Sequence, residues 1–147
     1  MVVRRERVVP AAPAEVWRIL SDPTRLAAWW PGVSRVEEAS REAWTTVLVS
    51  KTGKSVRADY SLVEAEEPQR LVWRQEVAAS PFERLLREST TEIALAPDPG
   101  GGTSVRLTLD QRQRGWARFS PFQLRAAARR QAEAALDGLA ELLGDER

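Results

Sequence analysis

Six consecutive stretches between residues 33 and 114 have the length and the bounding turn residues of β-strands, and one long helical pattern follows them. The predicted strands span 33–40, 42–50, 55–67, 70–77, 83–96 and 103–114. The connections between them, such as "KTGK" and "EEPQ", are short enough for hairpins, so the strands form an antiparallel meander. A sheet with one apolar face and an amphipathic helix each need a covering layer, and packing one on the other provides it.

The closing helix begins at the capping pair Ser120-Pro121 and ends at Gly144. Its apolar stripe consists of Ala128, Ala132, Ala135, Leu136, Leu139 and Leu143. The first half of the stripe is made of alanines, which either leave space above the sheet or let the helix pack closely on it. In the first alternative, Ala128 and Ala132 lie over a bound ligand.

The N-terminal part changes from strand to helix periodicity. Residues 2–9 have the pattern of a strand, and a helical period follows in "PAAPAEVWRILSD". Asp22-Pro23 ends this helix and starts a second short one, "PTRLAAWW", which Pro31-Gly32 terminates. Two short helices therefore separate the first strand from the meander.

The absence of histidine and cysteine limits the chemistry that the chain can perform. Thiol nucleophiles, Ser-His-Asp arrangements and the commonest metal ligands are excluded, and no phosphate-cradling loop is present, so we expect neither a metal nor a cofactor. The 147 residues, 43% hydrophobic and 29% charged, predict a single globular domain over 1–147. The sequence contains no apolar run of signal-peptide or transmembrane type, which predicts a cytoplasmic protein.

Residues 8–38, "VVPAAPAEVWRILSDPTRLAAWWPGVSRVEE", combine a strand, an Ala-Pro-x-x-Val-Trp helix, an Asp-Pro break and a Trp-Pro-Gly-Val turn. With "GTSVRLTLD" at 102–110 and the closing helix, this segment resembles the START-like superfamily of polyketide cyclase/dehydrase and lipid-transport proteins, related in fold to the birch-pollen allergens. The resemblance implies an α+β helix-grip fold, with a curved antiparallel seven-stranded sheet wrapped around the long C-terminal helix and two short helices after the first strand. It also implies a deep cavity between helix and sheet, whose mouth is bordered by the short helices and the strand-connecting loops.

Strict alternation along the predicted strands turns several polar side chains toward the closing helix. The inward set of ligand-binding candidates consists of Tyr60, Trp73, Gln75, Gln111 and Gln113. Pockets for hydrophobic ligands are mostly apolar and hold a few polar groups that orient the ligand, which the amides and Tyr60 would supply. In the alternative interpretation, these groups lie solvated or bonded to loop backbone at the open end of the sheet.

The pair Trp29-Trp30 follows Leu26 at helical spacing, next to the Pro31-Gly32 turn. Both rings can seal the short helix onto the sheet, or one ring can pack inward while its neighbour borders the cavity mouth. Trp29 and Trp30 are therefore both ligand-binding candidates, and the sequence leaves open which of them is the gate.

Acid–base chemistry needs a carboxylate or a tyrosine inside the cavity, and the catalytic candidates are Glu88 and Tyr60. A bulge in the predicted strand 83–96 decides whether Arg87 or Glu88 points inward. The leading interpretation is a domain that binds or transports a hydrophobic small molecule such as a lipid, polyketide or aromatic compound. The alternative is an enzyme of the cyclase or dehydratase type, in which Glu88 or Tyr60 moves a proton.

The segment 111–130 is rich in arginine, has no acidic residue and contains Trp116, Phe119 and Phe122. Its arginines are Arg112, Arg114, Arg118, Arg125, Arg129 and Arg130. Such a segment is either a solvated face or, as a further alternative function, a patch for an acidic partner, an anionic membrane surface or RNA.

Overall fold

One antiparallel sheet of seven strands is the frame of the molecule, in the order β1-β7-β6-β5-β4-β3-β2. The computed structural model describes residues 1–114 and 120–145. The strands are β1 (Val2–Val9), β2 (Val33–Glu37), β3 (Ala43–Val49), β4 (Ser55–Glu66), β5 (Arg70–Glu76), β6 (Leu86–Pro97) and β7 (Thr103–Gln113). Strands β2 to β7 pair in chain order, which confirms the predicted meander, and β1 pairs with β7 at the edge.

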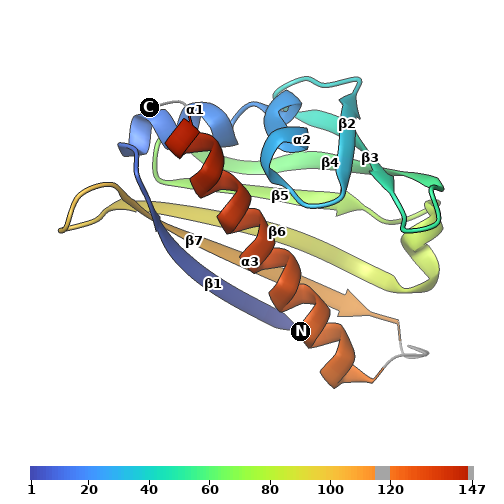
Figure 1. Cartoon of the computed structure of the whole chain (residues 1–147). Helices are drawn as coiled ribbons and strands as arrows, with labels where there is room; N and C mark the ends of the chain where they lie inside the picture. Colours follow the sequence, from blue (N-terminus) through green and yellow to red (C-terminus); the bar gives the residue numbers. More distant parts are fainter. Residues whose placement is uncertain (115–119, 146–147) are drawn as a thin grey trace.

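Helix α3 (Pro121–Asp145) crosses the concave face of the curved sheet, as Figure 1 shows in red. Its predicted apolar stripe is buried throughout, at Ala128, Ala132, Ala135, Leu136, Leu139 and Leu143. Two ion pairs join β1 to the exposed side of the helix: Arg5 Nε lies 3.0 Å from Glu133 Oε1, and Arg7 pairs with Asp137. The helix-grip arrangement that the resemblance implies is confirmed.

Two short helices and a turn connect β1 to β2: helix α1 (Pro13–Leu20), the 3-10 turn η1 (Pro23–Arg25) and helix α2 (Leu26–Trp29). One carboxylate oxygen of Asp22 accepts hydrogen bonds from Thr24 N at 3.0 Å and from Thr24 Oγ1 at 2.6 Å. This cap stabilises a separate turn, because it satisfies an amide that a helix start leaves unpaired. The predicted second helix is therefore divided into η1 and α2.

The strand predicted over 83–96 begins later than expected. Residues Pro81–Arg84 form a 3-10 turn, η2, and the Ser80 hydroxyl accepts a hydrogen bond from Phe82 N at 3.2 Å. A serine cap followed by proline is a helix start signal, and here it takes the first residues away from the strand. Strand β6 consequently starts at Leu86.

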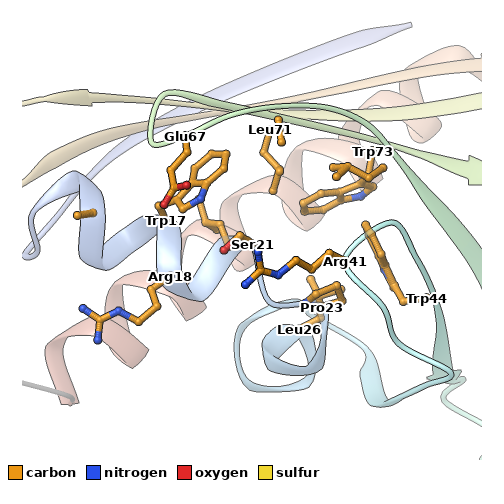
Figure 2. A pocket seen from close by; sticks show the side chains of 14 residues that line it. Trp17, Arg18, Ser21, Pro23, Leu26, Arg41, Trp44, Glu67, Leu71 and Trp73 are labelled. Atoms are coloured by element: carbon orange, nitrogen blue, oxygen red, sulfur yellow. The ribbon is translucent and has the colours of Figure 1, made fainter.

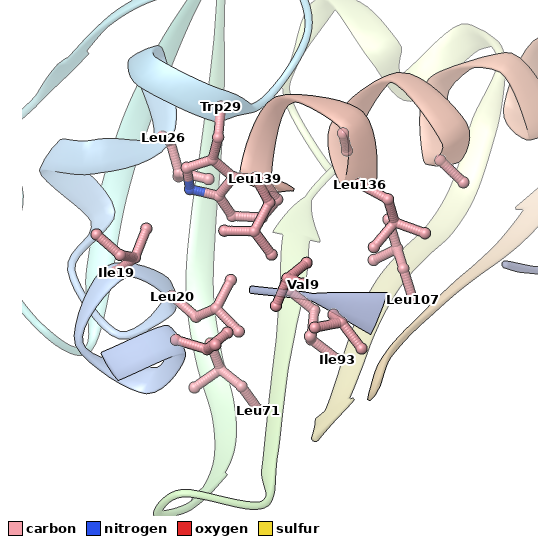
Figure 3. Close-up of a cluster of buried hydrophobic side chains, with 14 of the residues drawn as sticks. Val9, Ile19, Leu20, Leu26, Trp29, Leu71, Ile93, Leu107, Leu136 and Leu139 are labelled. Atoms are coloured by element: carbon pink, nitrogen blue, oxygen red, sulfur yellow. The ribbon is translucent and has the colours of Figure 1, made fainter. Parts of the chain in front are cut away.

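The hydrophobic core lies between the inner face of the sheet and the helices. Figure 3 shows Leu139 of α3 beside Trp29 and Leu26 of α2, at the centre of this cluster. The two helices approach closely at Gly138, where an added Cβ would lie only 2.3 Å from the carbonyl oxygen of Trp29. Glycine at 138 is thus required by the packing of α2 against α3.

Candidate ligand-binding site

A cavity of about 400 Å³ lies between α1, η1 and the inner face of β3, β4 and β5. We call it the α1 pocket. Its apolar walls include Trp17, Leu20, Leu26, Trp44, Leu71 and Trp73. Figure 2 shows Trp17 and Trp73 on either side of Leu71, around the hollow. The volume is within the range of about 300–1,000 Å³ that small-molecule sites occupy.

A second, much smaller cavity of about 50 Å³ lies nearer to α3, and we call it the α3 pocket. Trp30, Tyr60, Thr91 and Gln131 are among its lining residues. It is far smaller than the range of about 300–1,000 Å³ that small-molecule sites occupy. Leu26, Trp44 and Trp73 line both cavities, so these three side chains form the wall between them.

Five aromatic rings form a continuous chain through this wall. The ring centroids of Trp29 and Trp30 are 5.4 Å apart, those of Trp30 and Trp73 6.0 Å, and those of Trp73 and Trp44 5.7 Å, all with edge-to-face geometry. Trp44 and Tyr60 complete the chain as a stacked pair, with centroids 6.0 Å apart and an interplanar angle of 8°. Both arrangements are favourable for aromatic pairs, so the rings hold one another in place.

Tyr60 is the end of the aromatic chain, and its hydroxyl is a neutral donor. Burial raises the pKa of Tyr60 to about 12, although a hydrogen bond with the Thr46 side chain acts to lower it. A phenol with this pKa stays protonated at neutral pH, so it can donate a hydrogen bond but is a poor general base.

Tyr60 is the only tyrosine in the chain, which makes its titration directly observable. We expect ultraviolet difference absorbance to show no tyrosinate in the folded protein until the pH approaches about 12, against about 10 after denaturation. Because the unfolded chain loses this proton first, the contribution of Tyr60 to stability is complete below pH about 10 and is lost as the pH rises toward 12. A native titration near pH 10 would show that the hydroxyl is solvated, and Tyr60→Phe supplies the blank.

Three buried N–H groups have no hydrogen-bond partner within the described part of the chain: Trp29 Nε1, Trp44 Nε1 and Gln75 Nε2. All three are donors, and Gln75 lies directly across from Tyr60 in the β4–β5 ladder. Leaving such a group unpaired costs about 1–3 kcal/mol, so each requires an explanation. The ring of Trp44 lines both cavities, whereas its N–H is buried within the wall.

The predicted site residues divide into two groups. Trp30, Tyr60 and Trp73 line the α3 pocket, and Trp73 also lines the α1 pocket. Neither cavity is lined by Trp29, Gln75, Gln111, Gln113, Ala128 or Ala132. Of the tryptophan pair, Trp29 is 4% exposed and packs in the core, whereas Trp30 is half-buried beside a cavity. Trp30 therefore borders the α3 pocket and Trp29 borders neither cavity, and the assignment of a gate stays a prediction.

The space expected under the alanines of α3 is not where the large cavity lies. Ala128 is 4% and Ala132 0% exposed, because small side chains let the helix come close to the sheet. The cavity with room for a ligand lies instead beneath α1. Of the two alternatives that the alanine stripe allowed, close packing is the one that the structure shows.

Glu88 lies outside the cavity, and so does Arg87. A register shift between Leu86 and Glu88 leaves Ser89 and Thr91 buried on the inner face, while the side chains of Arg87 and Glu88 are exposed. Glu88 Oε2 pairs with Arg112 Nε across the ladder, at 3.5 Å. The expectation that one of the two charges points into the cavity is wrong, because the bulge turns both outward.

The alternation argument did not identify Trp17, Arg41 or Trp44, which all line the α1 pocket. Trp44 shares its face of β3 with Thr46 and Leu48, so the same alternation could have placed it inside. Trp17 and Arg41 line the α1 pocket only because α1 and the β2–β3 connection meet over the sheet. No sequence period signals that meeting.

The basic segment is partly neutralised. Arg112 pairs with Glu88, and Arg114 Nη2 lies 3.8 Å from Glu83 Oε1, while Arg125, Arg129 and Arg130 are exposed on α3. Trp116, Arg118 and Phe119 lie outside the described residues. Within residues 1–114 and 120–145 there is no helix with the length and hydrophobicity to cross a membrane, and no acidic cluster suited to a metal ion.

A curved seven-stranded sheet around a C-terminal helix, with a cavity on its inner face, defines the START-like class of helix-grip proteins. The family described as polyketide cyclase/dehydrase and lipid transport matches residues 1–144, and the chain belongs to this family. No curated protein matches the sequence.

Solved structures of low sequence identity share the fold. A START superfamily protein from Mycobacterium smegmatis is similar over 99% of both chains, with a TM-score of 0.82 and 12% identity. A protein from Nitrosomonas europaea gives a TM-score of 0.74 and 20% identity, over 99% of this chain and 96% of its own. The di-domain ARO/CYC StfQ of the steffimycin biosynthetic pathway gives 0.77 and 13%, and the match covers 99% of this chain and 51% of StfQ.

Proposed function

We propose that the chain binds a hydrophobic small molecule, such as a lipid, a polyketide or another aromatic compound, in the α1 pocket. The observation that supports this most strongly is a cavity of about 400 Å³ whose walls carry Trp17, Trp44 and Trp73. Burial of the ligand's apolar surface would drive binding at roughly 25 cal/mol per Å².

Enzymatic activity of the cyclase or dehydratase type has less support from the site. Glu88 is exposed and paired with Arg112, so it is too far outside to exchange a proton with a ligand in either cavity. Tyr60 lines the α3 pocket, and its raised pKa suits it to donate a hydrogen bond to a carbonyl oxygen rather than to remove a proton. Binding is therefore the function that the geometry favours.

Obstructing the α1 pocket tests this proposal. Ala65 lines the pocket at its exposed edge, so the ring of Ala65→Phe would intrude on the space that a ligand needs. We expect wild-type protein to bind the neutral probe methyl 2-naphthoate with a Kd of about 10–100 μM, and Ala65→Phe to weaken this at least about 10-fold. Isothermal titration calorimetry measures both.

Val63→Phe is the matched control, because Val63 lies on the same strand, is 53% exposed and lines neither cavity. It should keep the wild-type affinity, and both variants should keep the wild-type midpoint of denaturation to within a small shift. Equal affinity in wild type and Ala65→Phe, or uptake of the probe without saturation, would contradict the proposal.

A further inference from the structure

Two arginines stand at the open side of the α1 pocket. Arg18 belongs to the last turn of α1, and Arg41 lies in the connection between β2 and β3. Both also line a shallow hollow of about 430 Å³ that shares Ser21 and Pro23 with the pocket. The apolar cavity therefore opens into a vestibule that carries two guanidinium groups.

Arg41 is directed across this opening. Figure 2 shows its side chain extended toward Ser21, above Pro23 and Leu26, while Arg18 points away from the aromatic walls. Neither guanidinium forms a hydrogen bond or an ion pair in the described part of the chain. Arg70 on β5 is a contrasting case: it lies 2.5 Å from Glu64 and 2.7 Å from Glu92, and its pKa is raised mainly by hydrogen bonding to Glu92 and then to Glu64.

The surroundings of Arg41 contain one unpaired donor and two carboxylates. The Trp44 indole N–H is buried in the pocket wall without an acceptor, and the side chain of Trp44 is 4% exposed. Glu67 lines the pocket and Asp22 lines the vestibule. Glu67 stands over Trp17 at the other side of the pocket in Figure 2, and one oxygen of Asp22 accepts both bonds from Thr24.

We propose that the α1 pocket selects an apolar carboxylate, whose ring or chain lies against Trp44 and Trp73 and whose carboxylate binds Arg41. The planar guanidinium fork matches a carboxylate with two parallel hydrogen bonds, and Arg18 adds positive potential at the entrance. This inference depends on the proposed binding function and gives it a chemical class of ligand. In this proposal, Arg41 is the residue that makes the pocket prefer a carboxylate over a neutral ligand of the same shape.

A pair of probes that differ only in charge tests the inference. At neutral pH and low salt, wild-type protein should bind 2-naphthoate about 10-fold more tightly than methyl 2-naphthoate in calorimetry, since hydrogen bonds to charged groups are the stronger ones. Arg41→Gln should remove this preference, so that the ratio of the two affinities falls to about 1. Arg18→Gln should reduce the preference about 2-fold, and added salt should weaken it in the wild type.

Arg106→Gln is the matched control, because Arg106 is exposed on β7 and lines neither the pocket nor the vestibule. It should keep the full preference. Equal affinity of the wild type for the two probes, or a preference that survives in Arg41→Gln, would overturn the selection of a carboxylate while leaving the binding function intact. Failure of both probes to bind would overturn the proposed function, and with it this inference.

Discussion

Replacing Gly138 by alanine is expected to destabilise the protein by about 2 kcal/mol or more, although alanine is the better helix former. Helix propensity alone predicts a gain of about 1 kcal/mol from this change in α3. The new Cβ, however, would lie 2.3 Å from the backbone oxygen and 3.1 Å from the carbonyl carbon of Trp29. These are backbone atoms that no rotamer change can move, so α2 and α3 must separate.

The measurement is chemical denaturation followed by tryptophan fluorescence. Gly144→Ala is the matched control, because Gly144 is in the same helix and an added Cβ there would meet no atom within 4 Å. That variant should be as stable as wild type or slightly more stable. A Gly138→Ala protein at least as stable as wild type would contradict the packing of α2 on α3 described above.

Replacing Trp73 by alanine is expected to cost about 3–5 kcal/mol, the range for deleting a buried large aromatic side chain. Trp73 is 4% exposed and contacts the rings of both Trp30 and Trp44, so its loss interrupts the aromatic chain at its centre. The change also removes part of the wall between the α1 and α3 pockets. The resulting void cannot collapse easily, because Trp73 lies on a strand held by neighbours on both sides.

Urea denaturation of Trp73→Ala and of Trp30→Ala compares the stability lost with the central ring and with a peripheral ring. Trp30 is half-buried and follows α2, so its replacement should cost about half as much as that of Trp73. If Trp30→Ala were the more destabilising of the two, the aromatic chain would not have Trp73 as its centre.

Most of the fold follows from local patterns. The alternation of apolar residues, the hairpin-length connections and the Ser120-Pro121 start of the closing helix predict elements whose bounds agree with the structure to within a few residues. The exceptions are places where two local signals compete. Ser80 and Pro81 start a helical turn that includes Glu83 and Arg84, the first two residues of the predicted strand 83–96, and the turn signal prevails.

The site was less predictable, because its position depends on contacts between distant segments. Alternation correctly turns Tyr60 and Trp73 inward, yet it cannot reveal that α1 covers the far end of β4 and β5 and leaves the larger cavity there. The alanines of α3 illustrate the difficulty, since small residues are compatible with a void and with close packing. Arg41 has no periodic signal at all, because it belongs to a loop.

The central claim is that a ligand binds beneath α1, and its most direct test is to locate the bound ring by intermolecular nuclear Overhauser effects. With methyl 2-naphthoate at saturation, the account predicts contacts from the naphthyl protons to the methyl groups of Ala65 and Leu71, which line the α1 pocket. Contacts confined to Ala128 and Ala132 beneath α3, or contacts to surface methyl groups alone, would contradict it.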